Sequence, residues 1–223
     1  TRSIEVGAFY DCDKLTSVTI SDNVTSIGAS AFYDCDNFIS ITIPDSVTSI
    51  GDEAFRNCDA LTSIIIPDSV TSIGNYAVST GSKLANITVD ADNQYYSNDE
   101  HGVLFDKSKT TLIRYPIGNT SSSYTIPDTV KTIYDGAFNN GDNLTSVTIP
   151  DSVTSIGSSA FYHCNKITNV TIPDSVESIG SQAFCYCSKL ASVSIGDGVT
   201  SIGNYAFDYC STLESVTVGK SVT

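Results

Sequence analysis

One short repeat unit recurs at a constant interval along this chain and restricts its possible folds more than any other feature. The unit that begins at Ile43 reads IPDSVTSIGDEAFRNCDALTSII, and the unit that begins at Ile149 reads IPDSVTSIGSSAFYHCNKITNVT. The first residue of the unit recurs at Ile20, Ile43, Ile66, Val89, Ile126, Ile149, Ile172, Ile195 and Val218. These positions are 23 residues apart except at the step from Val89 to Ile126. A period of 23 residues indicates a solenoid, in which each repeat packs on its neighbours.

The end of each unit has the pattern of a short β-strand. In the segment LTSIII, Ile64 and Ile66 lie on one face, and Ser63 and Ile65 lie on the other. Such a strand is too short to be stable alone, because one repeat buries too few apolar groups to offset the ordering of its backbone. We therefore expect the strands of successive repeats to pair in a parallel ladder.

The rest of the unit is expected to form the turns and a second strand of each coil. Pro-Asp-Ser predicts a turn in which the aspartate accepts from nearby backbone amides, and Val-Thr-Ser-Ile predicts a second short strand. Gly51 is expected to permit the bend that follows this strand. The Asp-Glu-Ala-Phe-Arg-Asn-Cys run predicts a single helical turn with Phe55 and Cys58 on its inward side.

The pattern Leu-x-x-Ile-x-Ile-Pro-x-x-Val-x-x-Ile-Gly-x-x-Ala-Phe-x-x-Cys resembles the BspA-like leucine-rich repeats of bacterial and protist surface proteins. The resemblance covers almost the whole chain. It implies a curved, right-handed solenoid with the LTSVTI strands on the concave side, and a role in adhesion or protein binding at a cell surface. The predicted fold class is therefore a leucine-rich-repeat-like solenoid: a parallel β-sheet on the concave side, short strands and single helical turns elsewhere, and one β-hairpin insertion.

We expect residues 1–223 to form a single solenoid in which residues 89–125 are an irregular repeat. The step from Val89 to Ile126 is 14 residues longer than one repeat. Both ends of the chain fall inside a repeat, which predicts a fragment of a longer protein. The chain carries no signal-peptide pattern, and the resemblance implies a cell-surface or secreted location.

The irregular repeat has two apolar runs, 103–105 and 111–113, which are joined by the polar residues 106–109. This pattern predicts the β-hairpin. The segment also holds candidate partner-binding residues of the types that dominate tight protein interfaces: Tyr95, Tyr96, Phe105, Arg114 and Tyr115. The alternative is that these side chains bury the hairpin against the solenoid.

Six cysteines share one repeat position: Cys12, Cys35, Cys58, Cys164, Cys187 and Cys210. We expect a buried column of reduced thiols, since a column spaces its members one repeat apart and a metal site needs converging ligands. Cys185 lies outside this column, at a position that Tyr10, Tyr33, Arg56 or Asp208 holds in other repeats. It is the candidate for an exposed thiol.

Aspartates recur at the turn, at Asp22, Asp45, Asp68, Asp128, Asp151, Asp174 and Asp197. Local capping of the turn is the favoured explanation, and calcium binding along this column stays open as an alternative. The outward residues of the predicted strands are small and rich in hydroxyl groups. They form two columns, one at Ser17, Ser40, Ser63, Asn86, Ser146, Asn169, Ser192 and Ser215, and one at Thr19, Thr42, Ile65, Thr88, Thr148, Thr171, Ser194 and Thr217.

The net charge of −14 and the pI near 4.2 exclude a nucleic-acid backbone or an anionic membrane as a favoured partner, and no apolar run of membrane-spanning length occurs. His101 and His163 stand in no catalytic motif. We therefore predict a non-catalytic, cofactor-free module that binds a protein partner, with host or matrix proteins as the implied class. A structural spacer is the alternative, and an enzyme with its site at the insertion ranks third. The sequence leaves the oligomeric state open.

Overall fold

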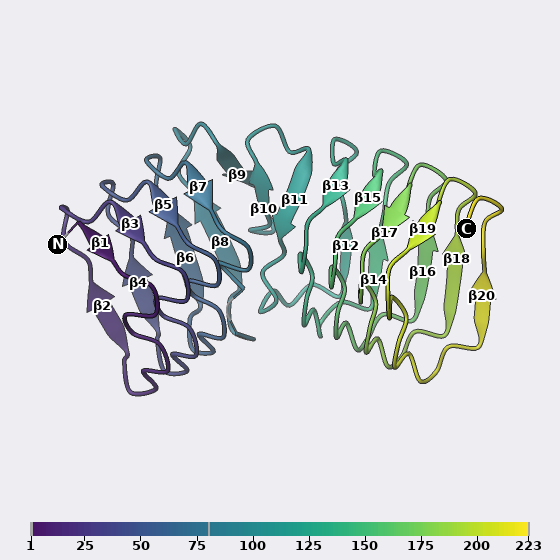
Figure 1. The fold of residues 1–223 in the computed structure, drawn as a ribbon, viewed down its shortest axis with the longest axis horizontal. Coiled ribbons are helices and arrows are strands. Elements are labelled where there is room, and N and C mark those ends of the chain that lie inside the picture. The colour runs from purple at the N-terminus through teal and green to yellow at the C-terminus, as the bar shows by residue number, and fades with distance from the viewer. Residues whose placement is uncertain (1, 80, 223) are drawn as a thin grey trace. The chain divides into compact units, whose positions relative to one another are not determined.

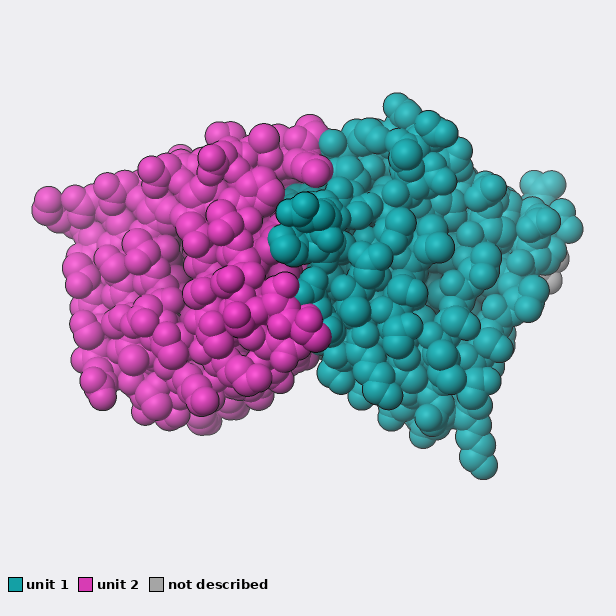
Figure 2. All heavy atoms as spheres, turned by 180° about the vertical axis from the view of Figure 1, so that it is seen from behind, with its two compact units in different colours: residues 1–107, 116–119 teal, residues 108–115, 120–223 magenta. Residues whose placement is uncertain are grey.

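A computed structural model describes residues 2–79 and 81–222 of the chain. The chain divides into two compact units (Figure 2). Unit 1 comprises residues 1–107 and 116–119, and unit 2 comprises residues 108–115 and 120–223. Each unit is a parallel β-solenoid in which successive coils stack on one another, with equivalent positions 23 residues apart.

Unit 1 carries two sets of parallel strands, and the strands within each set lie side by side in Figure 1. The short set is β1 (Ser3–Ile4), β3 (Ser26–Ile27), β5 (Ser49–Ile50) and β7 (Ser72–Ile73), paired in that order. The longer set is β2 (Ser17–Thr19), β4 (Ser40–Thr42), β6 (Ser63–Ile66) and β8 (Asn86–Val89), in which β2 pairs with β4 and β6 with β8. Paired residues are one repeat apart in the sequence, so the repeat period sets the register.

Unit 2 repeats the arrangement. Its short strands are β11 (Thr111–Arg114), β13 (Thr132–Ile133), β15 (Ser155–Ile156), β17 (Ser178–Ile179) and β19 (Ser201–Ile202). Its longer strands are β12 (Ser123–Thr125), β14 (Ser146–Thr148), β16 (Asn169–Ile172), β18 (Ser192–Ile195) and β20 (Ser215–Thr217). The predicted fold class, a leucine-rich-repeat-like solenoid with a parallel sheet of short strands, is confirmed.

The predicted hairpin runs 103–105 and 111–113 lie largely within strands β10 (Leu104–Asp106) and β11. The structure adds a strand that the sequence did not predict, β9 (Tyr96–Asn98), which pairs antiparallel with β10 in unit 1. Val103, Leu104 and Phe105 are buried. The insertion therefore contributes core residues as well as loops.

The predicted single helical turns are wrong, because the described residues form no helix and this part of the coil consists of successive turns. Glu53 and Asn57 have φ angles of 57° each, in the left-handed region, which a right-handed helix excludes. The N–H of Arg56 donates locally to the Glu53 carbonyl, whereas the N–H of Phe55 donates to Ala77 in the next coil (2.9 Å). Alternate amides thus donate to carbonyls of the next coil. In a helix these amides would instead donate to carbonyls of the same segment.

The glycine after each short strand is required by close packing rather than by an unusual φ angle. A Cβ atom on Gly51 would lie 2.5 Å from the backbone nitrogen of Ala29 in the preceding coil. At Gly180 the corresponding distance to the nitrogen of Ser158 is 2.4 Å. Any side chain here would therefore push two coils apart.

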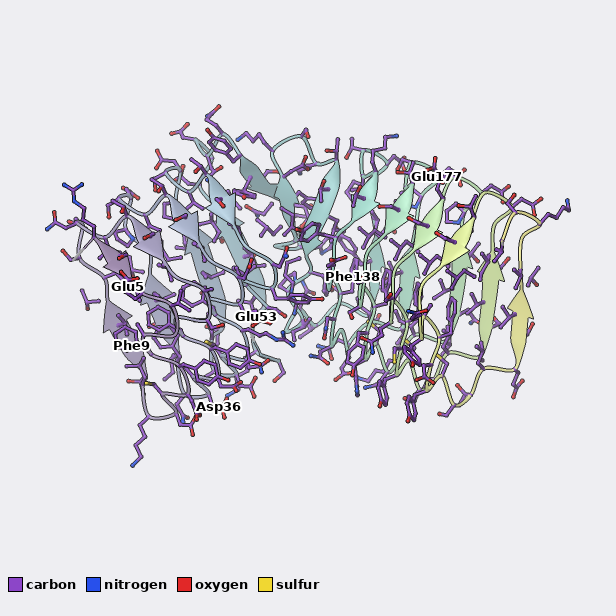
Figure 3. All side chains as sticks on the ribbon, in the orientation of Figure 1. Glu5, Phe9, Asp36, Glu53, Phe138 and Glu177 are labelled. Carbon is purple, nitrogen blue, oxygen red and sulfur yellow. The ribbon has the colours of Figure 1, made fainter. Side chains whose placement is uncertain are left out.

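Stacked phenylalanines fill the centre of each unit. In unit 2, ring centroids are 4.8 Å apart between Phe138 and Phe161 and between Phe161 and Phe184 (Phe138 is labelled in Figure 3). In unit 1, Phe32 stacks between Phe9 and Phe55 at 5.2 and 5.4 Å. Each ring is thus part of the contact that joins one coil to the next.

We expect Phe161→Ala to lower the free energy of unfolding of the chain by about 3–5 kcal/mol, because it removes a fully buried ring together with its two stacking contacts. Thr171→Ala, on the exposed side of β16, is the matched control, with an expected change below about 0.5 kcal/mol. Urea unfolding followed by circular dichroism measures both. Equal losses in the two variants would show that the ring stack does not stabilise the solenoid.

Candidate functional site

The longer strands turn every second side chain to solvent, as the sequence predicted. In β6, Ser63 and Ile65 are exposed while Ile64 and Ile66 are buried. We call the outward residues of these strands in unit 1 the front face: Ser17, Thr19, Ser40, Thr42, Ser63, Ile65, Asn86 and Thr88. This face is a row of mostly small polar groups interrupted by Ile65.

Two isoleucines are exposed at or beside the front face. Ile65 is 60% exposed although threonines hold the same position in the neighbouring coils, at Thr42 and Thr88. Ile39, one residue before β4, is 54% exposed. Both side chains present apolar surface to solvent in a row that is otherwise polar.

The insertion covers the edge of β8 within unit 1. The carbonyl of Gly102 accepts from the N–H of Ile87 (3.2 Å), which makes the loop a partial substitute for the next coil. Gly102 has a φ of 72°, and a Cβ there would lie 2.1 Å from Oδ1 of Asn86, so only glycine fits. The loop therefore lies against the front-face column at Asn86, whose side chain remains exposed.

The five candidate partner-binding residues divide between the two units. In unit 1, Tyr95 is 52% exposed, whereas the ring of Phe105 is buried. The hydroxyl of Tyr96 accepts from the N–H of Ile73 (2.9 Å). Of these three, only Tyr95 presents a large surface to solvent.

The other two candidates lie in unit 2 and are buried. The guanidinium of Arg114 donates to the backbone carbonyls of Gly136 (2.5 Å) and Asn139 (3.4 Å). The ring of Tyr115 stacks on Phe138 with centroids 5.3 Å apart. Arg114 and Tyr115 thus hold β11 onto the next coil, which is the structural alternative that the sequence left open.

Asn93 is a key residue of the insertion that sequence reasoning missed. Its amide nitrogen donates to the carbonyls of Pro67 (2.7 Å) and Val70 (3.0 Å). Its amide oxygen accepts from the N–H groups of Tyr95 and Tyr96 (2.8 Å each). The available signal was its spacing, since Asn93 stands 23 residues after Val70 in a column of buried valines.

The column cysteines are free thiols that serve as donors between coils. The thiols of Cys58, Cys164 and Cys187 donate to the carbonyls of phenylalanines 26 residues earlier, at 3.0–3.2 Å. Burial raises the pKa of Cys58 and of Cys164 to about 12. These thiols therefore stay protonated at neutral pH and take part in packing.

The expectation of an exposed thiol at Cys185 is wrong. Its side chain is 1% exposed. Burial raises the pKa of this thiol, and the nearby carboxylate of Asp208 raises it further. A buried and protonated thiol is a poor nucleophile.

The aspartate column joins adjacent coils at the C-terminal end of unit 2. A carboxylate oxygen of Asp174 accepts from the N–H of Asp197, 23 residues later (2.8 Å). Asp197 in turn accepts from the N–H and from the ammonium group of Lys220, both at 3.2 Å, and these contacts lower the pKa of Asp197. Within residues 2–79 and 81–222, no group of three or more histidine, cysteine, aspartate or glutamate side chains is arranged to hold a metal ion.

A row of half-exposed aromatic residues on the turns was not predicted. Tyr10 stacks on Tyr33 with ring centroids 5.0 Å apart, and the guanidinium of Arg56 lies over the rings of Tyr33 (5.9 Å) and Tyr76 (5.2 Å). In unit 2, Tyr186 stacks on Tyr209 (4.5 Å) and on His163 (4.9 Å). The rings face one another along the stack, so they stabilise adjacent turns.

Solved structures of bacterial leucine-rich-repeat proteins share this fold. A leucine-rich repeat protein from Eubacterium ventriosum is 29% identical with a TM-score of 0.78, and the match covers 98% of this chain and 71% of that one. A leucine rich cell surface protein from Faecalibacterium prausnitzii is 31% identical with a TM-score of 0.80, covering 96% and 62%. The pneumococcal vaccine antigen PcpA is 25% identical with a TM-score of 0.79, covering 96% and 59%. The chain thus spans less than two thirds of the last two proteins.

The coils and their spacing define a leucine-rich-repeat solenoid. A family model described as the BspA type leucine rich repeat region, in 6 copies, matches residues 2–121 and 118–223. The chain belongs to this family. A search of curated proteins found no match, and no membrane-spanning helix occurs in the part of the chain that the structure describes.

We expect Asn93→Ala to destabilise unit 1 by about 2–4 kcal/mol, because it removes four hydrogen bonds, two to backbone carbonyls and two from N–H groups. The loss should appear as early exchange of the Tyr95 and Tyr96 amides in hydrogen-exchange mass spectrometry. Asn37→Ala, which removes one exposed side-chain contact, is the control. Unchanged exchange in Asn93→Ala would contradict the role of this residue.

We expect Cys164 and Cys185 of the folded protein to react with iodoacetamide at pH 8 at least about 100-fold more slowly than in urea. At that pH a thiol with a pKa near 12 is ionised in about one molecule in 10⁴, and burial also blocks access. Peptide mass spectrometry after timed quenching gives the rate at each cysteine. Labelling of native Cys185 at the rate of the unfolded chain would restore the exposed-thiol interpretation.

Proposed function

We propose that this chain is a non-catalytic protein-binding or adhesion module of a cell-surface or secreted protein. Solenoids of this kind present extended surfaces to partners, since every coil repeats the same outward positions. The similarity to a leucine rich cell surface protein and to a vaccine antigen supports this location. Host or matrix proteins are the partner class to test first.

The observation that carries the proposal is the exposure of Ile65 on the front face. Full burial of an isoleucine side chain contributes about 1.5–3 kcal/mol, so a partner that covers Ile65 gains affinity from a group that the fold leaves exposed. Ile39 adds a second such group in the preceding coil. The surrounding serines and threonines lack large anchors, so each contact should be weak and binding should benefit from multivalency.

We expect immobilised residues 1–223 to capture at least one protein from an array of host and matrix proteins. Ile65→Thr should weaken that binding about 5–10-fold without loss of stability, because threonine is the residue of the adjacent coils. Thr171→Ala, at the same repeat position in unit 2, should leave binding unchanged.

Capture of no protein on the array would contradict the proposal and favour a structural spacer, which the near-identity of the repeats would also explain. Capture that is unaffected by Ile65→Thr would preserve a binding function and remove the front face of unit 1 as its site.

A further inference from the structure

A hollow of about 710 Å³ lies in unit 1 where β2 and β4 end. Its apolar walls include Val18, Ile20, Ile43 and Pro44. The carboxylates of Asp22 and Asp45, which occupy the same turn position in adjacent coils, also line it. The hollow therefore combines apolar surface with two negative charges.

The absence of an N–H group on proline explains why β2 and β4 end early here. Where the next coil has an N–H at this position, the ladder continues: Asp90 donates to the carbonyl of Ile66, and Gly196 to that of Ile172, both at 2.9 Å. Pro44 has no N–H to donate to Ile20, and β2 and β4 end one residue earlier, at Thr19 and Thr42. The paired strands thus stop before Ile20 and Ile43, which line the hollow together with Val18 and the last residues of the two strands.

The two carboxylates at the hollow are not neutralised within the described part of the chain. No lysine, arginine or histidine of residues 2–79 and 81–222 forms an ion pair with Asp22 or Asp45, and both residues are exposed. A cation placed between them would gain attraction from both carboxylates and would offset their mutual repulsion.

A lysine side chain already contacts the aspartate column elsewhere in this chain. In unit 2, Lys220 occupies the turn position that aspartate holds in the preceding coils, and its ammonium group lies 3.2 Å from a carboxylate oxygen of Asp197. A lysine side chain also carries an aliphatic stem, which suits the apolar walls contributed by Val18, Ile43 and Pro44. The net charge of −14 further favours a basic partner.

We propose that the hollow binds a lysine side chain from a basic segment of a protein partner. This inference rests on the proposed binding function and specifies the chemistry of the partner. The ammonium group lies between the carboxylates of Asp22 and Asp45, and the stem packs on the apolar walls.

The test uses N-acetyl-trilysine amide as the probe and the whole chain as the target. We expect ¹⁵N chemical-shift changes at the amides of Asp22, Thr42 and Asp45, and affinity from calorimetry that falls about 3–10-fold in Asp22→Asn/Asp45→Asn. Asparagine is nearly isosteric with aspartate, and a thermal melt checks that the double variant remains folded.

The matched control is Asp13→Asn/Asp36→Asn. These two exposed aspartates also occupy equivalent positions in adjacent repeats of unit 1, and neither lines the hollow (Asp36 is labelled in Figure 3). The control makes the same change in net charge, and we expect its affinity to change less than about 1.5-fold.

Equal losses in the two double variants, or shift changes away from the hollow, would overturn the proposal in favour of general electrostatic attraction. No binding of the trilysine probe would also overturn it. Protein capture on the array that persists in Asp22→Asn/Asp45→Asn would leave the binding function intact while removing this site. Trilysine binding without any array capture would preserve the site and contradict the broader function.

Discussion

Hydrogen bonds between adjacent coils are the interaction on which the rest of this structure depends. Backbone amides of each coil pair with carbonyls of its neighbour, both in the strands and in the turns. Side chains extend this pattern: Ser46 donates to Val24, Thr48 to Thr25, and Cys58 to Phe32, each one coil away. Because each partner lies at a fixed offset of 22, 23 or 26 residues, the repeat period is the physical condition for these bonds.

This coupling explains why most polar and sulfur-containing residues have structural roles. A buried donor such as the Cys164 thiol needs an acceptor, and the carbonyl of Phe138 provides one. The glycine column allows the backbones to approach closely enough for the bonds to form, as the position of Gly51 shows. Side chains that could have suggested catalysis or metal binding are therefore used to connect coils.

The features that distinguish this chain lie where the hydrogen bonds between coils, or the repeated residues of the unit, are interrupted. At Pro44, as at Pro67, Pro150 and Pro173, the ladder lacks a donor, and a hollow lined by two aspartates lies beside Pro44. At Ile65 an apolar side chain replaces the threonine of the neighbouring coils. In the insertion, Asn93 restores with one amide the bonds that an irregular backbone would have lost. The proposed binding surfaces lie at the first two interruptions, and the third shows how the fold accommodates a change in repeat length.

The sequence by itself determined the solenoid, its period and the alternation of buried and exposed residues, because strand pairing one repeat apart makes each of these a local property of the repeat. Tertiary structure decided the rest. The turns containing Glu53 and Asn57 have no helix because their alternate amides bond to the next coil, which a single-repeat pattern cannot reveal. Burial of Arg114, Tyr115 and Cys185 likewise depends on which neighbours cover them. Residue type alone suggested exposed contact residues at these positions, but packing between coils buries their side chains in the core.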